Sequence, residues 1–283
     1  MPDLKEFRLG IIGGCLSHQS DIAHSLLYHR QLDRMLQEGQ NIHLKVAITR
    51  HFDCDYSERL DALLGESDVD GVLLHLRVVF VAKSALLVNR LVDGKRYYRL
   101  HPFLLRRHEI GWNKSLVEES NRQALFASHE PQKPAGADED PFEFPTPSKR
   151  IFGFRLRSLN FAAGALVGLD DWAIADELDL FNRFKHACEQ RRLPFFVLGP
   201  TPVTTYSGET RLWRKMNQAL NATLPGMNAP FCLLEQVDDG DGNLMLRGDG
   251  LHLNEAGHAY VARRLYATMT PWIRENLASK GIK

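Results

Sequence analysis

The sequence predicts an α/β protein in which a mainly parallel β-sheet lies between two layers of helices, a three-layer α/β/α sandwich. Short apolar segments alternate with longer segments whose apolar residues recur at helical spacing. The chain has 283 residues, which is enough to bury a sizeable core within one domain. Hydrophobic residues make up 44% and charged residues 25%, as in an ordinary globular protein.

The first part of the chain alternates strand and helix. A buried strand is predicted over 7–12, because this segment is short and apolar and ends in two glycines. Apolar residues at three- and four-residue spacing predict a helix over 20–37. A second strand over 43–49, a short helix over 56–64 and a strongly apolar third strand over 69–76 follow.

The same alternation resumes after an interruption. An amphipathic helix is predicted over 171–192, followed by a strand over 194–198. A helix over 210–220 and a short strand over 231–235 come next. The last helix is predicted over 254–273, and its first residue, an asparagine, is a suitable N-cap.

Strands that alternate with helices imply a parallel sheet covered on both faces. Ligands of such sheets bind beyond the carboxyl ends of the strands. We therefore expect a functional site to be built from the segments that directly follow the strands, which are 13–17, 50–53, 77–80, 199–205 and the region before the last helix.

The interruption covers residues 78–168 and is predicted to be an insertion or lid within a single domain of residues 1–283. Its middle, 129–149, holds five of the 13 prolines together with a run of acidic residues, which predicts an exposed flexible loop. Basic clusters flank this loop at 95–99 and 106–108. These clusters are either a solvated surface or an anion-recognising part of the lid.

Charge and hydropathy exclude several classes of partner. Lys+Arg and Asp+Glu both number 35, so no long-range positive field attracts nucleic acid or anionic lipid. The most apolar window, 71–92, contains three full charges, so we expect no membrane helix and no membrane partner. Residues 1–7 do not resemble a signal peptide, and a cytoplasmic location with free thiols is the expectation.

The four cysteines are Cys15, Cys54, Cys188 and Cys232. They are far apart and form no CxxC, so the sequence predicts no metal site. The glycines after the first strand do not form a GxGxxG, which argues against a dinucleotide. We expect no cofactor.

The segment 13–17 is the first candidate for chemistry. Two glycines let the backbone turn sharply, and the start of the following helix would favour a Cys15 thiolate and offer N–H groups to an oxyanion. The alternative is that Cys15 is a small buried hydrophobe. Ser17 is a rival nucleophile, and its alternative role is an N-cap or a first-turn hydroxyl.

Asp249 and His252 are the second candidate. Their spacing lets a carboxylate hold one imidazole nitrogen while the other nitrogen faces a nucleophile. The alternative is an ordinary turn and a surface histidine.

Taken together, the two segments make the chain resemble the SGNH, or GDSL-type, hydrolase superfamily. Residues 249–257 (DGLHLNEAG) resemble the family's Asp-x-x-His block before the last helix. Residues 13–16 (GGCL) line up with its Gly-Asp-Ser-Leu block, with Gly14 at the usual Asp and Cys15 at the usual Ser. Residues 195–200 (FFVLGP) are similar to the family's penultimate core strand.

This resemblance implies a flavodoxin-like α/β/α fold and a hydrolase or acyltransferase that acts on an ester or thioester. Cys15 would be the nucleophile, His252 the general base and Asp249 the residue that orients the imidazole. A Cys–His–Asp triad is chemically suited to acyl transfer, including transfer from thioesters.

The chain departs from the family where the oxyanion hole is completed. The family has a glycine after the second strand and an asparagine after the third, whereas this chain has Arg50 and a segment, 75–80, without asparagine. Residues 168–171 (GLDD) weakly resemble the family's Gly-x-Asn-Asp block, but they lie after the insertion instead of directly after the third strand. The candidates for contacting substrate or oxyanion are Gly14, Ser17, Arg50, Arg77 and Asn160.

Two functions follow from these residues. The leading hypothesis is an esterase or acyltransferase whose partner is a small-molecule acyl ester or thioester. The alternative is a catalytically degenerate module in which Arg50, Arg77 and the basic insertion bind a small ligand, in particular an anion. Hydrolysis versus transfer, the acyl group, the acceptor and the oligomeric state stay open at this level.

Overall fold

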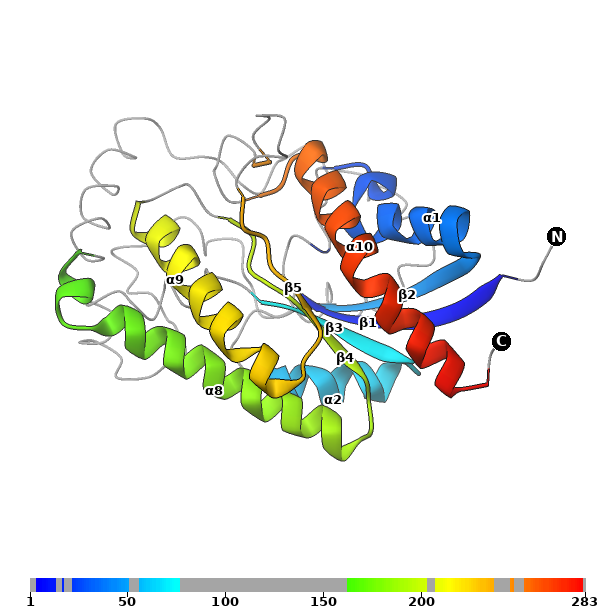
Figure 1. Ribbon diagram of the computed structural model, residues 1–283, viewed down its shortest axis with the longest axis horizontal. Helices are drawn as coiled ribbons and strands as arrows, with labels where there is room; N and C mark the ends of the chain where they lie inside the picture. The colour runs from blue at the N-terminus through cyan, green and yellow to red at the C-terminus, as the bar shows by residue number, and fades with distance from the viewer. Residues whose placement is uncertain are drawn as a thin grey trace, which may run out of the picture.

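The computed structural model describes residues 4–13, 17, 22–50, 56–76, 162–202, 207–236, 245–246 and 252–281. Within these residues, one parallel sheet has the strand order β2-β1-β3-β4-β5 (Figure 1). This is the doubly wound order of flavodoxin-like folds, whose ligands bind where the strand order reverses. The predicted fold class is confirmed.

The strands are β1 (Lys5–Gly13), β2 (Ile42–Arg50), β3 (Gly71–His75), β4 (Phe195–Leu198) and β5 (Phe231–Cys232). Strands β1 and β2 pair along their whole length, so that Gly13 lies beside Arg50. In the same sheet, Ile12 pairs with Leu74 and His75 pairs with Leu198. The register therefore brings the last residues of β1, β2 and β3 to one edge.

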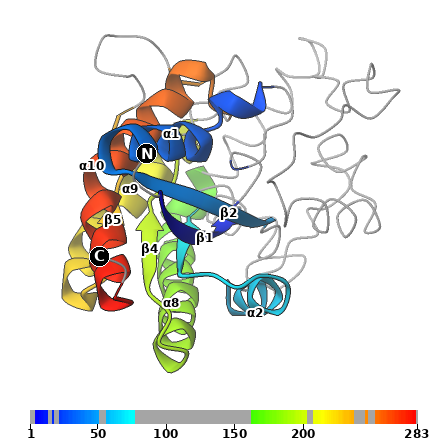
Figure 2. The ribbon, with the colours of Figure 1, turned by 90° about the vertical axis from the view of Figure 1, so that its right-hand side faces the viewer.

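The main helices are α1 (Tyr28–Gln40), α2 (Tyr56–Glu66), α8 (Leu169–Gln190), α9 (Ser207–Thr223) and α10 (Glu255–Ser279). Helices α1 and α10 pack on each other over one face of the sheet. Helices α2, α8 and α9 pack on the other face. Figure 2 shows α1 and α10 on one side of β1 and β2 and α2 on the other.

Alternate residues of the central strands enter two separate cores. In β1, Leu9 and Ile11 pack toward α1 and α10, whereas Ile12 packs toward α2 and α8. In β3, Leu73 and Leu74 divide in the same way. Because both faces of the sheet are buried at its centre, β3 and β4 are nearly continuous apolar runs, which is the pattern that predicted them. The strands β1 and β2 also carry charged residues, among them Arg8 and Lys45.

The predicted helix over 20–37 was wrong at its start. The α-helix begins at Tyr28, after a short 3-10 turn, η2 (His24–Leu26), and an extended Leu27 with ψ of 141°. Leu27 is buried in this extended conformation. Periodicity of apolar residues alone does not separate a buried residue in an extended segment, such as Leu27, from one on a helix.

At the other end of the chain, the N-cap was predicted correctly. The side chain of Asn254 accepts a hydrogen bond from the N–H of Gly257 at 2.8 Å, and α10 begins at the next residue. The helix continues past Pro271 to Ser279, which is longer than predicted, and β5 is shorter than predicted.

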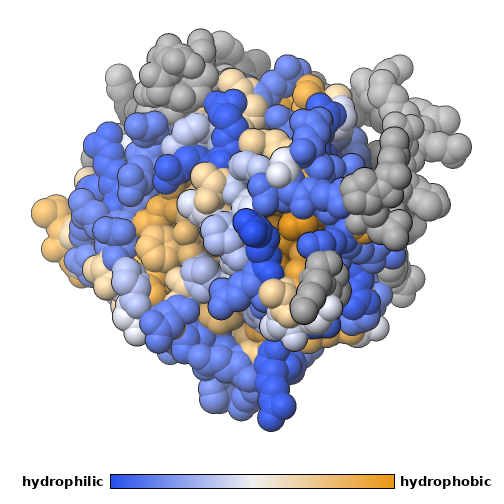
Figure 3. Space-filling model, turned by 45° about the vertical axis from the view of Figure 1, so that its right-hand side comes forward, coloured by the Kyte–Doolittle hydropathy of each residue, from blue (hydrophilic) through white to orange (hydrophobic). Residues whose placement is uncertain are grey.

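Most of the predicted insertion, including 129–149, lies outside the described residues. Its last part is described: 162–166 are helical, and Gly168, with φ of 75°, precedes α8. In the described part of the chain, no helix combines the length and the apolar character needed to span a membrane. On the face drawn in Figure 3, hydrophilic side chains cover most of the described surface, and apolar side chains form separate patches.

Candidate functional site

The carboxyl end of β1 is closed by a tight contact between Gly13 and Ser17. A Cβ atom on Gly13 would lie 2.4 Å from the Ser17 hydroxyl oxygen, which is too close for any side chain. Gly13 and the side chain of Ser17 are therefore in direct contact. Residues 14–16, which include the predicted nucleophile Cys15, lie outside the described residues.

Ser17 is fully buried and is held at two atoms. Its hydroxyl oxygen lies 2.8 Å from the hydroxyl oxygen of Tyr28, and its carbonyl oxygen lies 3.0 Å from Nε2 of His29. Because a carbonyl only accepts, Nε2 of His29 carries the proton. Ser17 is not the N-cap of α1, since that helix begins at Tyr28.

Tyr28 lies at the centre of the buried polar groups at this edge of the sheet. Its backbone N–H donates to Nδ1 of His258 at 3.3 Å, and the two rings stack with centroids 6.2 Å apart and planes at 11°. The ring of His75, the last residue of β3, meets Tyr28 edge-on at 5.9 Å. Burial raises the pKa of the Tyr28 phenol, against the lowering effect of Ser17, so the phenol stays protonated.

Two imidazoles beside Tyr28 are held neutral. Burial, with Arg30 and His24 nearby, lowers the pKa of His29 to about 3. Burial, and then the neighbouring His252, lowers the pKa of His258 to about 4. Because Nδ1 of His258 accepts the Tyr28 N–H, the proton of this neutral ring is on Nε2.

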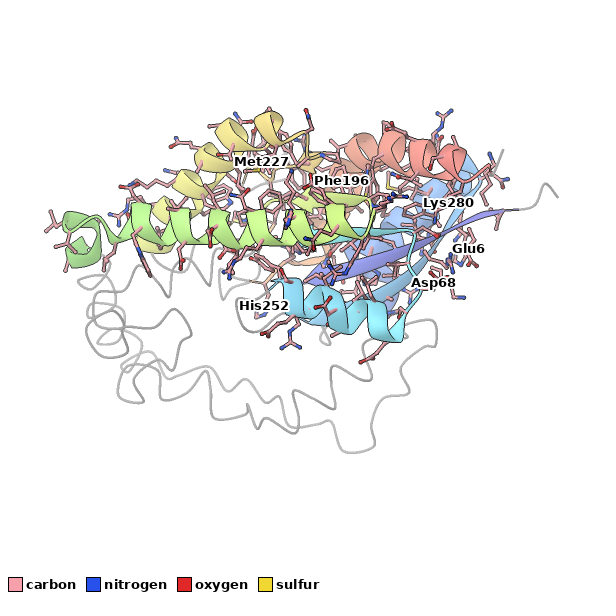
Figure 4. All side chains as sticks on the ribbon, turned by 90° about the horizontal axis from the view of Figure 1, so that it is seen from below. Glu6, Asp68, Phe196, Met227, His252 and Lys280 are labelled. Atoms are coloured by element: carbon pink, nitrogen blue, oxygen red, sulfur yellow. The ribbon has the colours of Figure 1, made fainter. Side chains whose placement is uncertain are left out.

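His252 lies in the segment that leads into α10 and is partly buried. Figure 4 shows it at the end of the sheet toward which β1 points, whereas Asp68 and Lys280 lie toward the opposite end. A bridge between Leu246 and Leu253 and the hydrogen bond from the Asn254 N–H to the Met245 carbonyl at 3.0 Å hold this segment in place.

Gly257 explains why the first turn of α10 sits so close to that segment. A Cβ atom at this position would lie 2.2 Å from the Met245 carbonyl oxygen. Together with the Asn254 cap, this close approach fixes the direction in which the chain enters the helix, directly after His252.

Of the remaining predicted site residues, the structure describes some and not others. The backbone of Arg50 lies beside Gly13 at the end of β2. Asp170, which belongs to the GLDD segment 168–171, is buried at the start of α8, and its carboxylate pairs with Arg211 at 2.8 Å. The other candidates lie outside the described residues, so the arrangement of the triad stays a prediction: Gly14, Cys15, Arg77, Asn160 and Asp249.

Sequence reasoning missed the residues that the fold gathers around Ser17. His258 directly follows the 249–257 block, and His75 falls at a strand end, so both had a positional signal. Tyr28 and His29 had none, because they were assigned to the middle of a predicted helix.

The described residues hold neither a metal site nor a reactive thiol. No three His, Cys, Asp or Glu side chains of this part of the chain converge as a metal site requires. Cys188 and Cys232 are buried, and burial raises the pKa of both thiols, that of Cys188 to about 12. These two thiols are therefore poor nucleophiles at neutral pH.

No protein-family model and no curated protein matches the sequence. Among solved structures, the chain is similar to the psychrotrophic esterase EstA from Pseudoalteromonas sp. (12% identity, 94% of this chain and 98% of that chain, TM-score 0.48). It is similar to a catalytic mutant of Axe2, an acetylxylan esterase from Geobacillus stearothermophilus (12% identity, 95% and 96%, TM-score 0.45). A third is a member of the lipolytic protein G-D-S-L family from Veillonella parvula (10% identity, 93% and 98%, TM-score 0.44). Likeness at this level carries no conclusion about chemistry.

Proposed function

We propose that the chain is an esterase-type hydrolase or acyltransferase that acts on a small acyl ester or thioester. Cys15 is the nucleophile, His252 the general base and Asp249 the residue that orients the imidazole. The proposal is supported most by Tyr28, which contacts both Ser17, two residues after Cys15, and His258, six residues after His252. Ser17 and His258, which are close in the sequence to the proposed nucleophile and base, thus lie at one edge of the sheet, and this supports the proposal.

The reaction follows from these groups. As the Cys15 sulfur forms a bond to the acyl carbon, His252 takes the thiol proton and Asp249 stabilises the imidazolium. The imidazolium then protonates the leaving alcohol or thiol as its bond to the acyl carbon breaks, which leaves a thioester on Cys15. Water or another acceptor, deprotonated by His252, attacks the carbonyl carbon of this thioester. The bond between the acyl carbon and the sulfur breaks, the acylated product leaves, and the imidazolium returns the proton to the Cys15 sulfur.

The oxyanion that forms in both steps needs donors at the same edge of the sheet. The backbone N–H of Cys15 is the proposed first donor. Arg50 is a further candidate, because its backbone pairs with Gly13 at the point where the 13–17 segment begins.

Turnover of p-nitrophenyl acetate and of a short acyl thioester by Cys15→Ala tests the nucleophile. We expect kcat to fall by at least about a thousandfold, because the residues of such a triad act as a unit. Cys54→Ser is the matched control and is expected to keep its activity. The two buried thiols of the described chain, Cys188 and Cys232, are held protonated and do not compete.

Mass spectrometry of the trapped acyl-enzyme separates Cys15 from its rival. An acyl group on Cys15 supports the proposal, whereas an acyl group on Ser17 overturns it. Full turnover in Cys15→Ala overturns it as well. If the wild-type protein turns over none of these substrates but binds a small carboxylate, the degenerate binding module replaces the enzyme.

A further inference from the structure

Tyr28 contacts three segments that are far apart in the sequence. Its hydroxyl lies on Ser17, after β1, its ring meets His75, at the end of β3, and its ring and N–H contact His258, in the first turn of α10. These three segments meet at the carboxyl edge of the sheet.

The parts of Tyr28 have separable tasks. The ring and the backbone N–H make the contacts with His75 and His258, and a phenylalanine would keep both of them. The hydroxyl makes the contact with Ser17 at 2.8 Å, in a fully buried setting. Compared with phenylalanine at this position, Tyr28 therefore adds only the hydrogen bond to Ser17.

Ser17 comes two residues after the proposed nucleophile, Cys15, in the sequence. Gly13, two residues before Cys15 in the sequence, is fixed by its pairing with Arg50 of β2 and by the close approach of the Ser17 hydroxyl. Gly13 and Ser17 are therefore two fixed points, and Cys15 is midway between them in the sequence. If Ser17 loosens, one of the two fixed points is lost.

We infer that Tyr28 is a positioning residue of the proposed reaction, whose hydroxyl holds Ser17 and thereby keeps the Cys15 sulfur in line with the acyl carbon. This inference rests on the proposed function. It assigns Ser17 a supporting role instead of a nucleophilic one. A misplacement of the reacting atom by about 1 Å costs roughly a hundredfold in rate, so a single buried hydrogen bond can have a large effect on kcat.

The test compares kcat and KM of the wild type, Tyr28→Phe, Ser17→Ala and the double variant with p-nitrophenyl acetate. We expect Tyr28→Phe and Ser17→Ala each to lower kcat by roughly 10- to 100-fold with KM changed by less than about twofold. Because both changes remove the same hydrogen bond, we expect the double variant to be no slower than the slower single variant.

Tyr266→Phe is the matched control. The hydroxyl of Tyr266 accepts a hydrogen bond from the Gln40 side chain at 3.3 Å, at the far end of α1, and this tyrosine takes no part in the proposed site. Its kcat is expected to equal that of the wild type. Circular dichroism and Tm confirm for each variant that the measured protein is folded.

The outcomes separate this inference from the proposed function. If Cys15→Ala is inactive while Tyr28→Phe keeps wild-type kcat, positioning by Tyr28 is wrong and the nucleophile stands. Positioning by Tyr28 is equally wrong if Tyr28→Phe lowers Tm without changing kcat, or if the effects of the two single variants multiply. If Cys15→Ala stays active, or the wild type has no acyl turnover, the proposed function is wrong and this inference is wrong with it.

Discussion

At the scale of single residues, the carboxyl edge of the sheet is built from buried polar rings. His29, His75 and His258 all lie buried around Tyr28. Burial disfavours the charged form of an imidazole, and it holds His29 and His258 neutral at neutral pH. A buried edge of this kind keeps its hydrogen bonds strong because water does not compete for them.

Two of these rings make stability depend on pH. The folded-state pKa values of His29, about 3, and His258, about 4, lie below the ordinary value of 6.5. The contribution of the two neutral rings to the free energy of unfolding is therefore complete above pH 6.5. It is lost as the pH falls toward their folded-state pKa values. Each ring lowers the free energy of unfolding by about 1.4 kcal/mol per pH unit over that range.

Urea unfolding at several pH values between 7 and 4.5 checks this prediction. In His258→Asn, the amide can accept the Tyr28 N–H but does not titrate, so we expect a pH dependence that is shallower by about one proton. The exposed His186→Asn is the control and should leave the slope unchanged. Equal slopes for His258→Asn and the wild type would contradict the prediction.

At the scale of elements, the start of α10 is the best example of local sequence determining local structure. Asn254 caps the helix, and Gly257 allows its first turn to lie against the Met245 carbonyl. The cap was predicted from the sequence, since capping depends on neighbours within one turn, whereas the contact between Gly257 and Met245 was not. The start of α1 could not be predicted in this way, because Leu27 is held extended by its burial in the core.

Asn254→Ala is expected to lower the free energy of unfolding by about 1 kcal/mol, because the N–H of Gly257 loses its acceptor. Asn254→Asp keeps the acceptor and should keep most of this stability. Thermal unfolding measures both variants. Asn276→Ala, near the other end of α10, tests whether any asparagine of this region has the same effect. An equal loss in Asn276→Ala would show that capping is not the cause.

At the scale of the whole molecule, the two ends of the sheet are built differently. The carboxyl edge holds the buried rings around Tyr28, whereas the amino end is held by charges. The Asp70 carboxylate accepts hydrogen bonds from the backbone N–H of Arg8 at 2.7 Å, from its guanidinium at 2.9 Å and from Lys280 at 2.5 Å. These bonds tie the entry into β3 to β1 and to the residue that follows α10.

Asp70→Asn is therefore expected to reduce stability without affecting the site. Burial by itself would raise the pKa of Asp70, but the hydrogen bonds from Arg8 and Lys280 outweigh it, so the pKa lies below its usual value and the carboxylate stabilises the fold at neutral pH. Since Arg8 and Lys280 are partly exposed to screening water, we expect a loss of about 1–3 kcal/mol in urea unfolding. The kcat of the folded variant should match that of the wild type. A marked fall in kcat would contradict the prediction that the amino end of the sheet contributes to stability alone and not to the site.

The sequence by itself determined the α/β/α class, the approximate position of every described strand and the cap of the last helix. These depend on apolar periodicity and on contacts within a turn, which are written locally along the chain. Only the tertiary structure decided that Ser17, Tyr28, His75 and His258 meet at one edge of the sheet. Tyr28 and His258 are separated by 230 positions, and no local pattern encodes their contact. Strand order and helix packing brought them together, because a parallel sheet collects its strand ends at one edge whatever their distance along the chain.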